Sequence, residues 1–155
     1  MQHFEIAAIP QHNRNSNYLY SPQQSENKEP KQPILTKNAP APTGGYNQAI
    51  RAGQFLYLSG QGPSTPDGVL IASDFEMKVR QVFENLSQVA TAAGFSLSDA
   101  IKINVYLESM DDFDTMDRIY REVVPMPYPT RTTISCDVGG IGIEVDAVLW
   151  SDDVK

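Results

Sequence analysis

From residue 46 onward, hydrophobic positions either alternate with polar ones or recur at helical spacing. Residues 54–59 have the composition of a strand, and a turn signal follows at residues 66–68. Apolar residues at three- and four-residue spacing then predict an amphipathic helix that ends at Gly94. Ser73–Glu76 has the form of a capping box at its start. The predicted buried face consists of Phe75, Val79, Val82, Phe83, Leu86, Val89, Ala90 and Ala93.

The second half of the chain predicts another helix and three more strands. Residues 101–108 alternate, with Ile101, Ile103, Val105 and Leu107 as the expected inward positions. Asp111 or Asp112 is expected to cap a helix that Pro125 ends. Its apolar face holds Phe113, Met116, Ile119, Tyr120 and Val123. Two strands follow over residues 132–138 and 143–150, joined by the glycine-rich residues 139–142.

This order of elements indicates an α+β domain, in which a single sheet carries both helices on one face. The other sheet face would be bare, and its mixture of polar and apolar residues suggests that partner subunits cover it. Residues 1–35 are rich in Gln, Asn, Ser and Pro, which predicts an extended or partly disordered N-terminal arm. The folded domain is therefore expected over residues 36–155.

Composition limits the partners of this domain. The 155 residues are 41% hydrophobic and 20% charged, as in ordinary globular proteins. The net charge of -7 disfavours nucleic acid and anionic membranes, because both attract basic surfaces. No apolar run approaches the ~18 residues of a membrane span, and no signal-peptide pattern opens the chain. A cytoplasmic location is expected.

Several kinds of site are disfavoured by residue type. Both histidines, His3 and His12, precede the predicted domain, so it has no imidazole for a Ser–His pair, a Cys–His pair or a usual zinc site. Cys136 alternates with apolar neighbours, which favours a buried, inert thiol. The glycines at residues 60–62 and 139–142 do not lead into a helix, so turns are favoured over a phosphate-binding loop.

Arg131 is the candidate with the clearest chemistry. Pro129 fixes the approach of the chain, and alternation places Arg131 and Thr133 on one face of the predicted strand. If the last two strands pair, Glu144 lies near both residues. Arginine binds a carboxylate through two parallel hydrogen bonds. The pattern alone fits either a carboxylate-binding site or a structural ion pair between Arg131 and Glu144.

From about residue 34 to residue 150, the chain resembles the Rid family of reactive-intermediate deaminases, also called YjgF-like proteins. The resemblance is carried by Ala39–Ile50, Tyr57–Gln61, Val82–Gly94, Asp112-Phe113 before Tyr120, Pro129–Thr132 and Ile143–Ala147. It implies a chorismate-mutase-like fold, a homotrimer whose sheets form a barrel, and clefts between subunits. It also implies hydrolysis of 2-imino or enamino acids to 2-keto acids and ammonia, without cofactor or metal.

Roles for individual residues follow as a hypothesis from the resemblance together with the chemistry of imine hydrolysis. Arg131 would bind the substrate carboxylate, Glu144 would activate water or transfer protons, and Thr133 would orient the water or substrate. Tyr46, together with Ser59-Gly60, would supply the wall of the cleft and its backbone contacts.

One substrate-binding position departs from the family. Asp117 stands where many members have asparagine, and its charge would repel an anionic substrate or select one with an amino group. Two alternatives therefore stay open. One is a specialised pathway enzyme for another imine, enamine or aminomuconate-like acid, and the other is a non-catalytic protein that binds small carboxylates.

Overall fold

The computed structural model describes residues 30–152, so most of the predicted arm, residues 1–29, and the last residues 153–155 lie outside the described part. The elements are β1 (Gln32–Ile34), β2 (Ala49–Ala52), β3 (Phe55–Gln61), α1 (Phe75–Ala92), β4 (Ala100–Leu107), α2 (Phe113–Val123), β5 (Thr130–Ser135) and β6 (Ile143–Trp150). Short 3₁₀ turns at Leu97–Asp99 and Met110–Asp112 precede β4 and α2.

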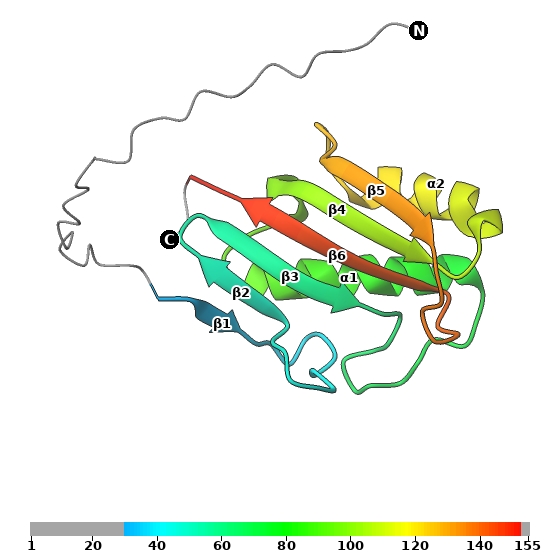
Figure 1. The fold of residues 1–155 in the computed structure, drawn as a ribbon, viewed down its shortest axis with the longest axis horizontal. Helices are drawn as coiled ribbons and strands as arrows, with labels where there is room; N and C mark the ends of the chain where they lie inside the picture. Colours follow the sequence, from blue (N-terminus) through cyan, green and yellow to red (C-terminus); the bar gives the residue numbers. More distant parts are fainter. Residues whose placement is uncertain (1–29, 153–155) are drawn as a thin grey trace, which may run out of the picture.

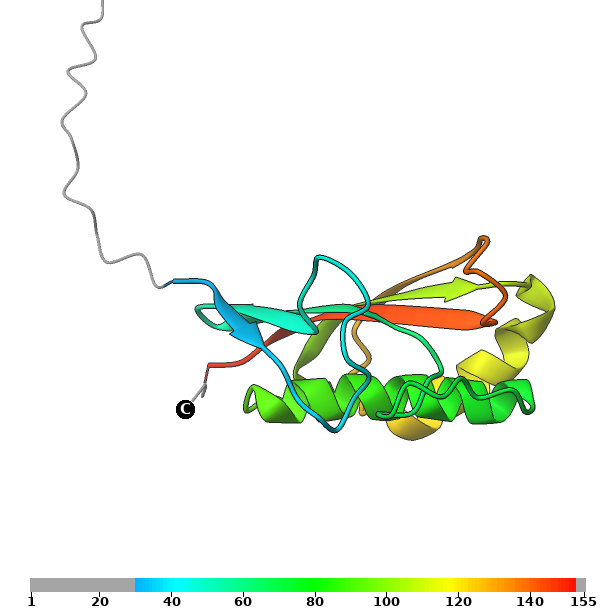
Figure 2. The same cartoon turned by 90° about the horizontal axis from the view of Figure 1, so that it is seen from below.

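The six strands form one sheet in the order β1-β2-β3-β6-β4-β5. Both helices lie on the same face of this sheet, and the opposite face is open (Figures 1 and 2). This arrangement confirms the predicted α+β architecture. The pairing of β1 with β2 places residues 32–34 in the sheet.

The last two strands do not pair, because β4 lies between them, so the condition for placing Glu144 near Arg131 is not met. Strand β4 pairs antiparallel with β6 and parallel with β5. Parallel neighbours need a crossover connection, and α2 supplies it between β4 and β5. Ile103 on β4, which is buried towards the helices, pairs with Arg131, whereas Tyr106 on the open face pairs with Glu144. Arg131 and Glu144 therefore project from opposite faces of the sheet.

Helix α1 has the predicted inward face, but its cap is shifted by one residue. Asp74, and not Ser73, is the N-cap, and its carboxylate accepts a hydrogen bond from the Met77 backbone N–H at 3.0 Å. Both residue types cap helices well, so the pattern did not choose between them. At the other end Gly94 adopts a φ of 81°, which ends the helix as expected.

Two details of the next segment also differ from the prediction. A bulge between Ala100 and Lys102 turns Ala100 inward and leaves Ile101 43% exposed on the open face. Ser109 caps the 3₁₀ turn before α2, with its hydroxyl accepting from the Asp111 N–H at 3.1 Å. Asp112 stands at the N-cap position of α2, yet its side chain makes no capping hydrogen bond.

The hydrophobic core fills the layer between sheet and helices, with Phe83, Leu56 and Ile119 among its fully buried side chains. Each such side chain contributes about 1.5–3 kcal/mol by leaving water. The open face instead carries half-exposed apolar side chains at Phe55, Tyr57, Ile101, Ile134 and Trp150. No helix within residues 30–152 is long and apolar enough to cross a membrane.

Candidate functional site

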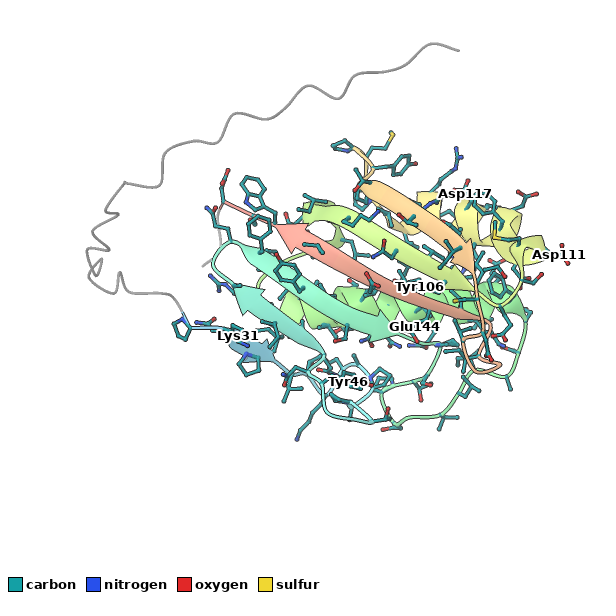
Figure 3. The ribbon with its side chains drawn as sticks, viewed as in Figure 1. Lys31, Tyr46, Tyr106, Asp111, Asp117 and Glu144 are labelled. Carbon is teal, nitrogen blue, oxygen red and sulfur yellow. The ribbon has the colours of Figure 1, made fainter. Side chains whose placement is uncertain are left out.

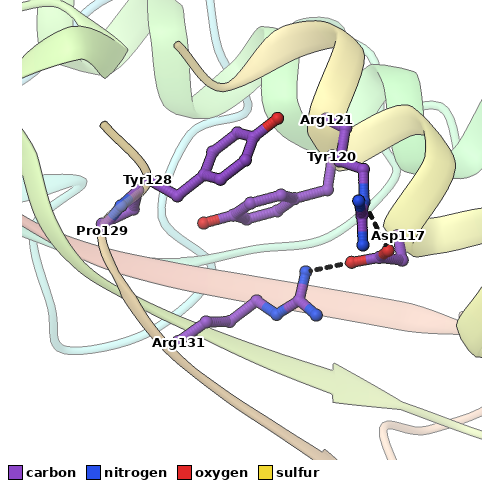
Figure 4. Close-up of a pocket in the computed structure, with 6 residues that line it drawn as sticks. All are labelled: Asp117, Tyr120, Arg121, Tyr128, Pro129 and Arg131. Atoms are coloured by element: carbon purple, nitrogen blue, oxygen red, sulfur yellow. Dashed lines mark hydrogen bonds and ion pairs between the residues drawn. The ribbon is translucent and has the colours of Figure 1, made fainter. Parts of the chain in front are cut away.

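Arg131 lies in a cavity of about 390 Å³ between α2 and the start of β5 (Figure 4). We call it the arginine cavity, and its lining residues are Asp117, Tyr120, Arg121, Tyr128, Pro129 and Arg131. The Tyr120 ring lies between Arg131 and Tyr128, and Tyr128 is 44% exposed. The arginine predicted from the sequence therefore has room for a small ligand beside it.

The guanidinium of Arg131 is held by an ion pair and by aromatic rings. Its Nη1 donates to Asp117 Oδ1 at 2.7 Å, and only 22% of the side chain is exposed. Its central carbon lies 4.6 Å from the Tyr120 ring centroid and 5.6 Å from that of Phe113. Such cation–π contacts contribute about 0.5–2 kcal/mol. Nε and Nη2 have no protein partner within residues 30–152, so they can donate to a carboxylate.

Asp117 bridges two arginines. Its Oδ1 accepts from Arg131, and its Oδ2 accepts from Arg121 Nε at 2.8 Å. Burial alone would raise the pKa of Asp117, but the hydrogen bonds from the two guanidiniums outweigh burial and lower this pKa below its usual value. The carboxylate is therefore ionised at neutral pH. Arg121, Asp117 and Arg131, here called the arginine triad, carry a net charge of +1.

Two hydroxyls near the arginine triad are buried without a hydrogen-bond partner in residues 30–152: Tyr120 Oη and Thr133 Oγ1. Thr133 pairs with Val105 in the β4–β5 register and therefore shares the helix-side face with Arg131. Burial raises the pKa of Tyr120, which keeps its hydroxyl neutral. A buried polar group without a partner costs about 1–3 kcal/mol. The predicted role of Thr133 in orienting water or substrate stays a prediction.

A second cavity, of about 170 Å³, is lined by three other predicted site residues. We call it the carboxylate cavity after Glu144. Tyr46 and Gly60 line it together with Glu144, so the structure brings together three of the residues that the sequence selected. Its further lining consists of Pro40, Ala41, Thr43, Gln48, Gln61, Gly62 and Ser64.

Glu144 reaches across the backbone of Gly60. A Cβ atom at residue 60 would lie 2.8 Å from Glu144 Cδ and would overlap Oε1, so a side chain here would displace the carboxylate. Ser59, the neighbouring predicted residue, does not line the cavity. Its hydroxyl donates to the Asn47 carbonyl at 2.7 Å and ties β3 to the loop that carries Tyr46.

Buried amides that the sequence reasoning missed build the walls of the carboxylate cavity. Gln48 makes four hydrogen bonds, all to backbone atoms of Thr36, Ala39 and Pro40. Asn85, on the apolar face of α1, donates to the carbonyls of Gly62 and Ser64. Two signals were available: Gln48 lies inside the Ala39–Ile50 motif, and Asn85 interrupts a hydrophobic helix face.

The two cavities lie in different parts of the subunit. Figure 3 shows Asp117 on α2 beside the β5 edge, whereas Glu144 projects from the open face and Tyr46 lies in the loop before β2. One subunit thus has a cavity lined by two arginines on the helix side and a carboxylate on the other side. It does not bring Arg131 and Glu144 together.

Comparisons with known proteins agree with the resemblance. The profile of a family described as Endoribonuclease L-PSP matches residues 36–148. The RutC family protein PH0854 of Pyrococcus horikoshii is 39% identical over 125 residues, covering 79% of this chain and 99% of that protein. A 2-iminobutanoate/2-iminopropanoate deaminase of Dermatophagoides farinae is 33% identical over 106 residues, covering 68% of this chain and 83% of that protein.

A solved structure supports the same relation. The crystal structure of RidA from the Antarctic bacterium Psychrobacter sp. PAMC 21119 superposes with a TM-score of 0.74 at 34% identity. The match covers 77% of this chain and 99% of that chain, so its single sheet with two helices is the fold found here.

Proposed function

Because the chain belongs to the Endoribonuclease L-PSP family, which includes the Rid, YjgF and RutC proteins, we propose that it is a hydrolytic deaminase of reactive 2-imino and enamino acids. The similar protein named 2-iminobutanoate/2-iminopropanoate deaminase suggests this reaction. The observation that carries the proposal is the placement of Arg131: it lines a small cavity and keeps donors unused for a carboxylate.

The proposal requires a second subunit at each site. Arg131 and Glu144 project from opposite sheet faces of one chain, so a shared site needs Arg131 from one copy and Glu144 from another. We propose a homotrimer in which the open sheet faces turn inward and the clefts lie between subunits. Half-exposed side chains such as Tyr57 and Trp150 on that face support burial against other copies.

In this mechanism Arg131 binds the substrate carboxylate and holds the C=N carbon near a water molecule. Glu144 takes a proton as the water adds to carbon, and a proton passes to the imine nitrogen. The adduct then carries a hydroxyl and an amino group on the same carbon. Its hydroxyl proton passes to the amino nitrogen, the C–N bond breaks, ammonia leaves, and the oxygen of the water becomes the keto oxygen. An imine carbon is already electrophilic, so these steps use only side chains and water.

The test mixes two inactive variants. Arg131→Ala and Glu144→Gln, each alone, should lose release of ammonia from freshly generated 2-iminopropanoate. Co-expressed chains should regain activity, because some clefts then combine an intact Arg131 with an intact Glu144. Random assembly restores about one quarter of the clefts in a symmetric oligomer.

The outcomes separate the parts of the proposal. No recovery in mixed oligomers of normal size would mean that both residues act within one chain, or that the site is elsewhere. Full activity of Arg131→Ala would refute the role of the arginine. Size-exclusion chromatography with light scattering measures the trimer independently of activity.

A non-catalytic carboxylate-binding protein is the second candidate. The ion pair between Arg131 and Asp117 favours it, because a ligand carboxylate must share the guanidinium with a residue already bound. Wild-type protein that keto acids stabilise against heat, but that releases no ammonia from any imine, would support binding alone.

A further inference from the structure

The arginine triad leaves unused hydrogen-bond donors on two guanidiniums. Arg131 uses one nitrogen on Asp117, and Arg121 uses Nε, so the terminal nitrogens of Arg121 have no partner within residues 30–152. Arg121 lines the arginine cavity, and its side chain is 66% exposed. The two guanidiniums bind different oxygens of Asp117, at 2.8 Å and 2.7 Å, so they lie on either side of one carboxylate.

The net charge of the triad attracts one anionic group, and the unused donors of Arg121 offer hydrogen bonds to a second one. After Arg131 has bound a first carboxylate, the two arginines, Asp117 and that carboxylate sum to zero. A second carboxylate would then face the exposed nitrogens of Arg121. The aspartate that seemed to repel anions instead holds a second cation at the cavity opening.

Resting on the function proposed above, we propose that Arg121 is a specificity-determining residue that selects imines with a distal carboxylate. The preferred substrate class is the four- or five-carbon 2-iminodicarboxylate. Arg131 binds the carboxylate next to the C=N carbon, and Arg121 binds the distal carboxylate. Charge-assisted, two-pronged hydrogen bonding by arginine supplies the selectivity. The hydrolysis itself is unchanged.

Arg121 also has a structural explanation that the test must separate. It stands in the last turn of α2, where a cation interacts favourably with the helix dipole, and it pairs with Asp117 one turn earlier. A purely structural Arg121 would affect all substrates alike. A specificity residue changes the ratio between substrates.

The experiment compares substrates of equal size and different charge. The imines of glutamate and glutamine are generated in situ by an amino acid oxidase, and kcat/KM is measured for each by release of ammonia. Wild-type protein should prefer the charged imine, and Arg121→Gln should lower the ratio of the two kcat/KM values by about tenfold or more. Arg121→Lys should keep part of the preference.

The matched control is Arg118→Gln. Arg118 lies on the same helix and carries the same charge, but it binds Glu76 and Glu122, away from the arginine cavity. It should leave the ratio unchanged. An unchanged ratio in Arg121→Gln, or an equal drop in Arg118→Gln, would overturn the inference.

A binding measurement keeps this inference separate from the proposed reaction. Calorimetry with 2-oxoglutarate and 2-oxopentanoate compares ligands with and without the distal carboxylate. Tighter binding of 2-oxoglutarate that disappears in Arg121→Gln supports selection, even if no imine is hydrolysed and the proposed reaction fails. Rapid hydrolysis by wild-type protein without preference for either charge overturns the inference and leaves the reaction intact.

Discussion

Helix α2 takes part in two networks of ion pairs, which differ in whether positive and negative side chains balance. On the outer surface, Glu76 and Glu122 each bind both Arg80 and Arg118, which makes a closed ring of two cations and two anions. We call it the charge ring. The arginine triad, by contrast, has two arginines on a single aspartate. A balanced ring links two helices, whereas an unbalanced triad beside a cavity can bind an additional anion.

Burial sharpens the difference. All four side chains of the charge ring are at least 39% exposed, whereas Asp117 and Arg131 are 17% and 22% exposed. Exposed ion pairs contribute little because water and salt screen them. Partly buried pairs are screened less, so the triad should dominate both function and local stability.

The largest expected effect is the loss of activity when Arg131 of the triad is replaced by lysine. The same replacement at Arg118 of the charge ring is the comparison. Arg131→Lys keeps the charge but loses the two-pronged geometry, so kcat/KM for imine hydrolysis should fall by about a hundredfold or more. Arg118→Lys should stay close to wild type. Steady-state ammonia release measures both, and similar activities in the two variants would remove the functional distinction between the networks.

The next largest effect is on the free energy of unfolding, when one carboxylate of each network is replaced by its amide. Asp117→Asn leaves Arg131 half-buried without its ion-pair partner and should lower the free energy of unfolding by about 1–2 kcal/mol. Glu122→Gln should lower it less, because its partners are exposed. Denaturant titration at fixed protein concentration measures both values. A larger loss for Glu122→Gln would show that the charge ring is the more important network.

Added salt should weaken the ion pairs of the charge ring more than those of the arginine triad. Raising ionic strength to 1 M shortens the screening length to about 3 Å. The stability difference between Glu122→Gln and wild type should then vanish, whereas the difference for Asp117→Asn should persist. Thermal unfolding in low and high sodium chloride checks this, with loss of both differences as the contradicting result.

Lowering the pH should give the smallest effect on the stability difference between a charge-ring variant and wild type. Hydrogen bonds from Arg80, and then from Arg118, lower the pKa of Glu122, and both arginines also lower the pKa of Glu76. A carboxylate with a lowered pKa stabilises the fold above its unfolded pKa and loses that contribution as pH falls through the folded value. The difference between Glu122→Gln and wild type should therefore shrink below the ordinary glutamate range. Unfolding at stepwise lower pH measures it, and a difference that grows in acid would contradict the assignment.

Local periodicity predicted the layers of this fold but not the order of its strands. The bounds of β6 and the inward face of α1 followed from spacing, because burial on one face imposes a fixed period. Spacing along one strand contains no information about its neighbour, so the place of β4 between β5 and β6 was missed.

The candidate site shows the same limit. The sequence selected Arg131, Asp117 and Glu144 individually, and the structure places the first two in one cavity and the third in another. The pairing of Asp117 with Arg131 could not be read from the sequence, because Arg131 is 14 residues away on another element. Only the crossover through α2 brings these two residues together.

The amide of Gln48 has a consequence for protein engineering. It binds residues 36, 39 and 40 through their backbone groups, so these four hydrogen bonds do not depend on the side chains of those residues. A library that varies Ala41 and Thr43 while keeping Gln48 would therefore alter the lining of the carboxylate cavity on an intact scaffold.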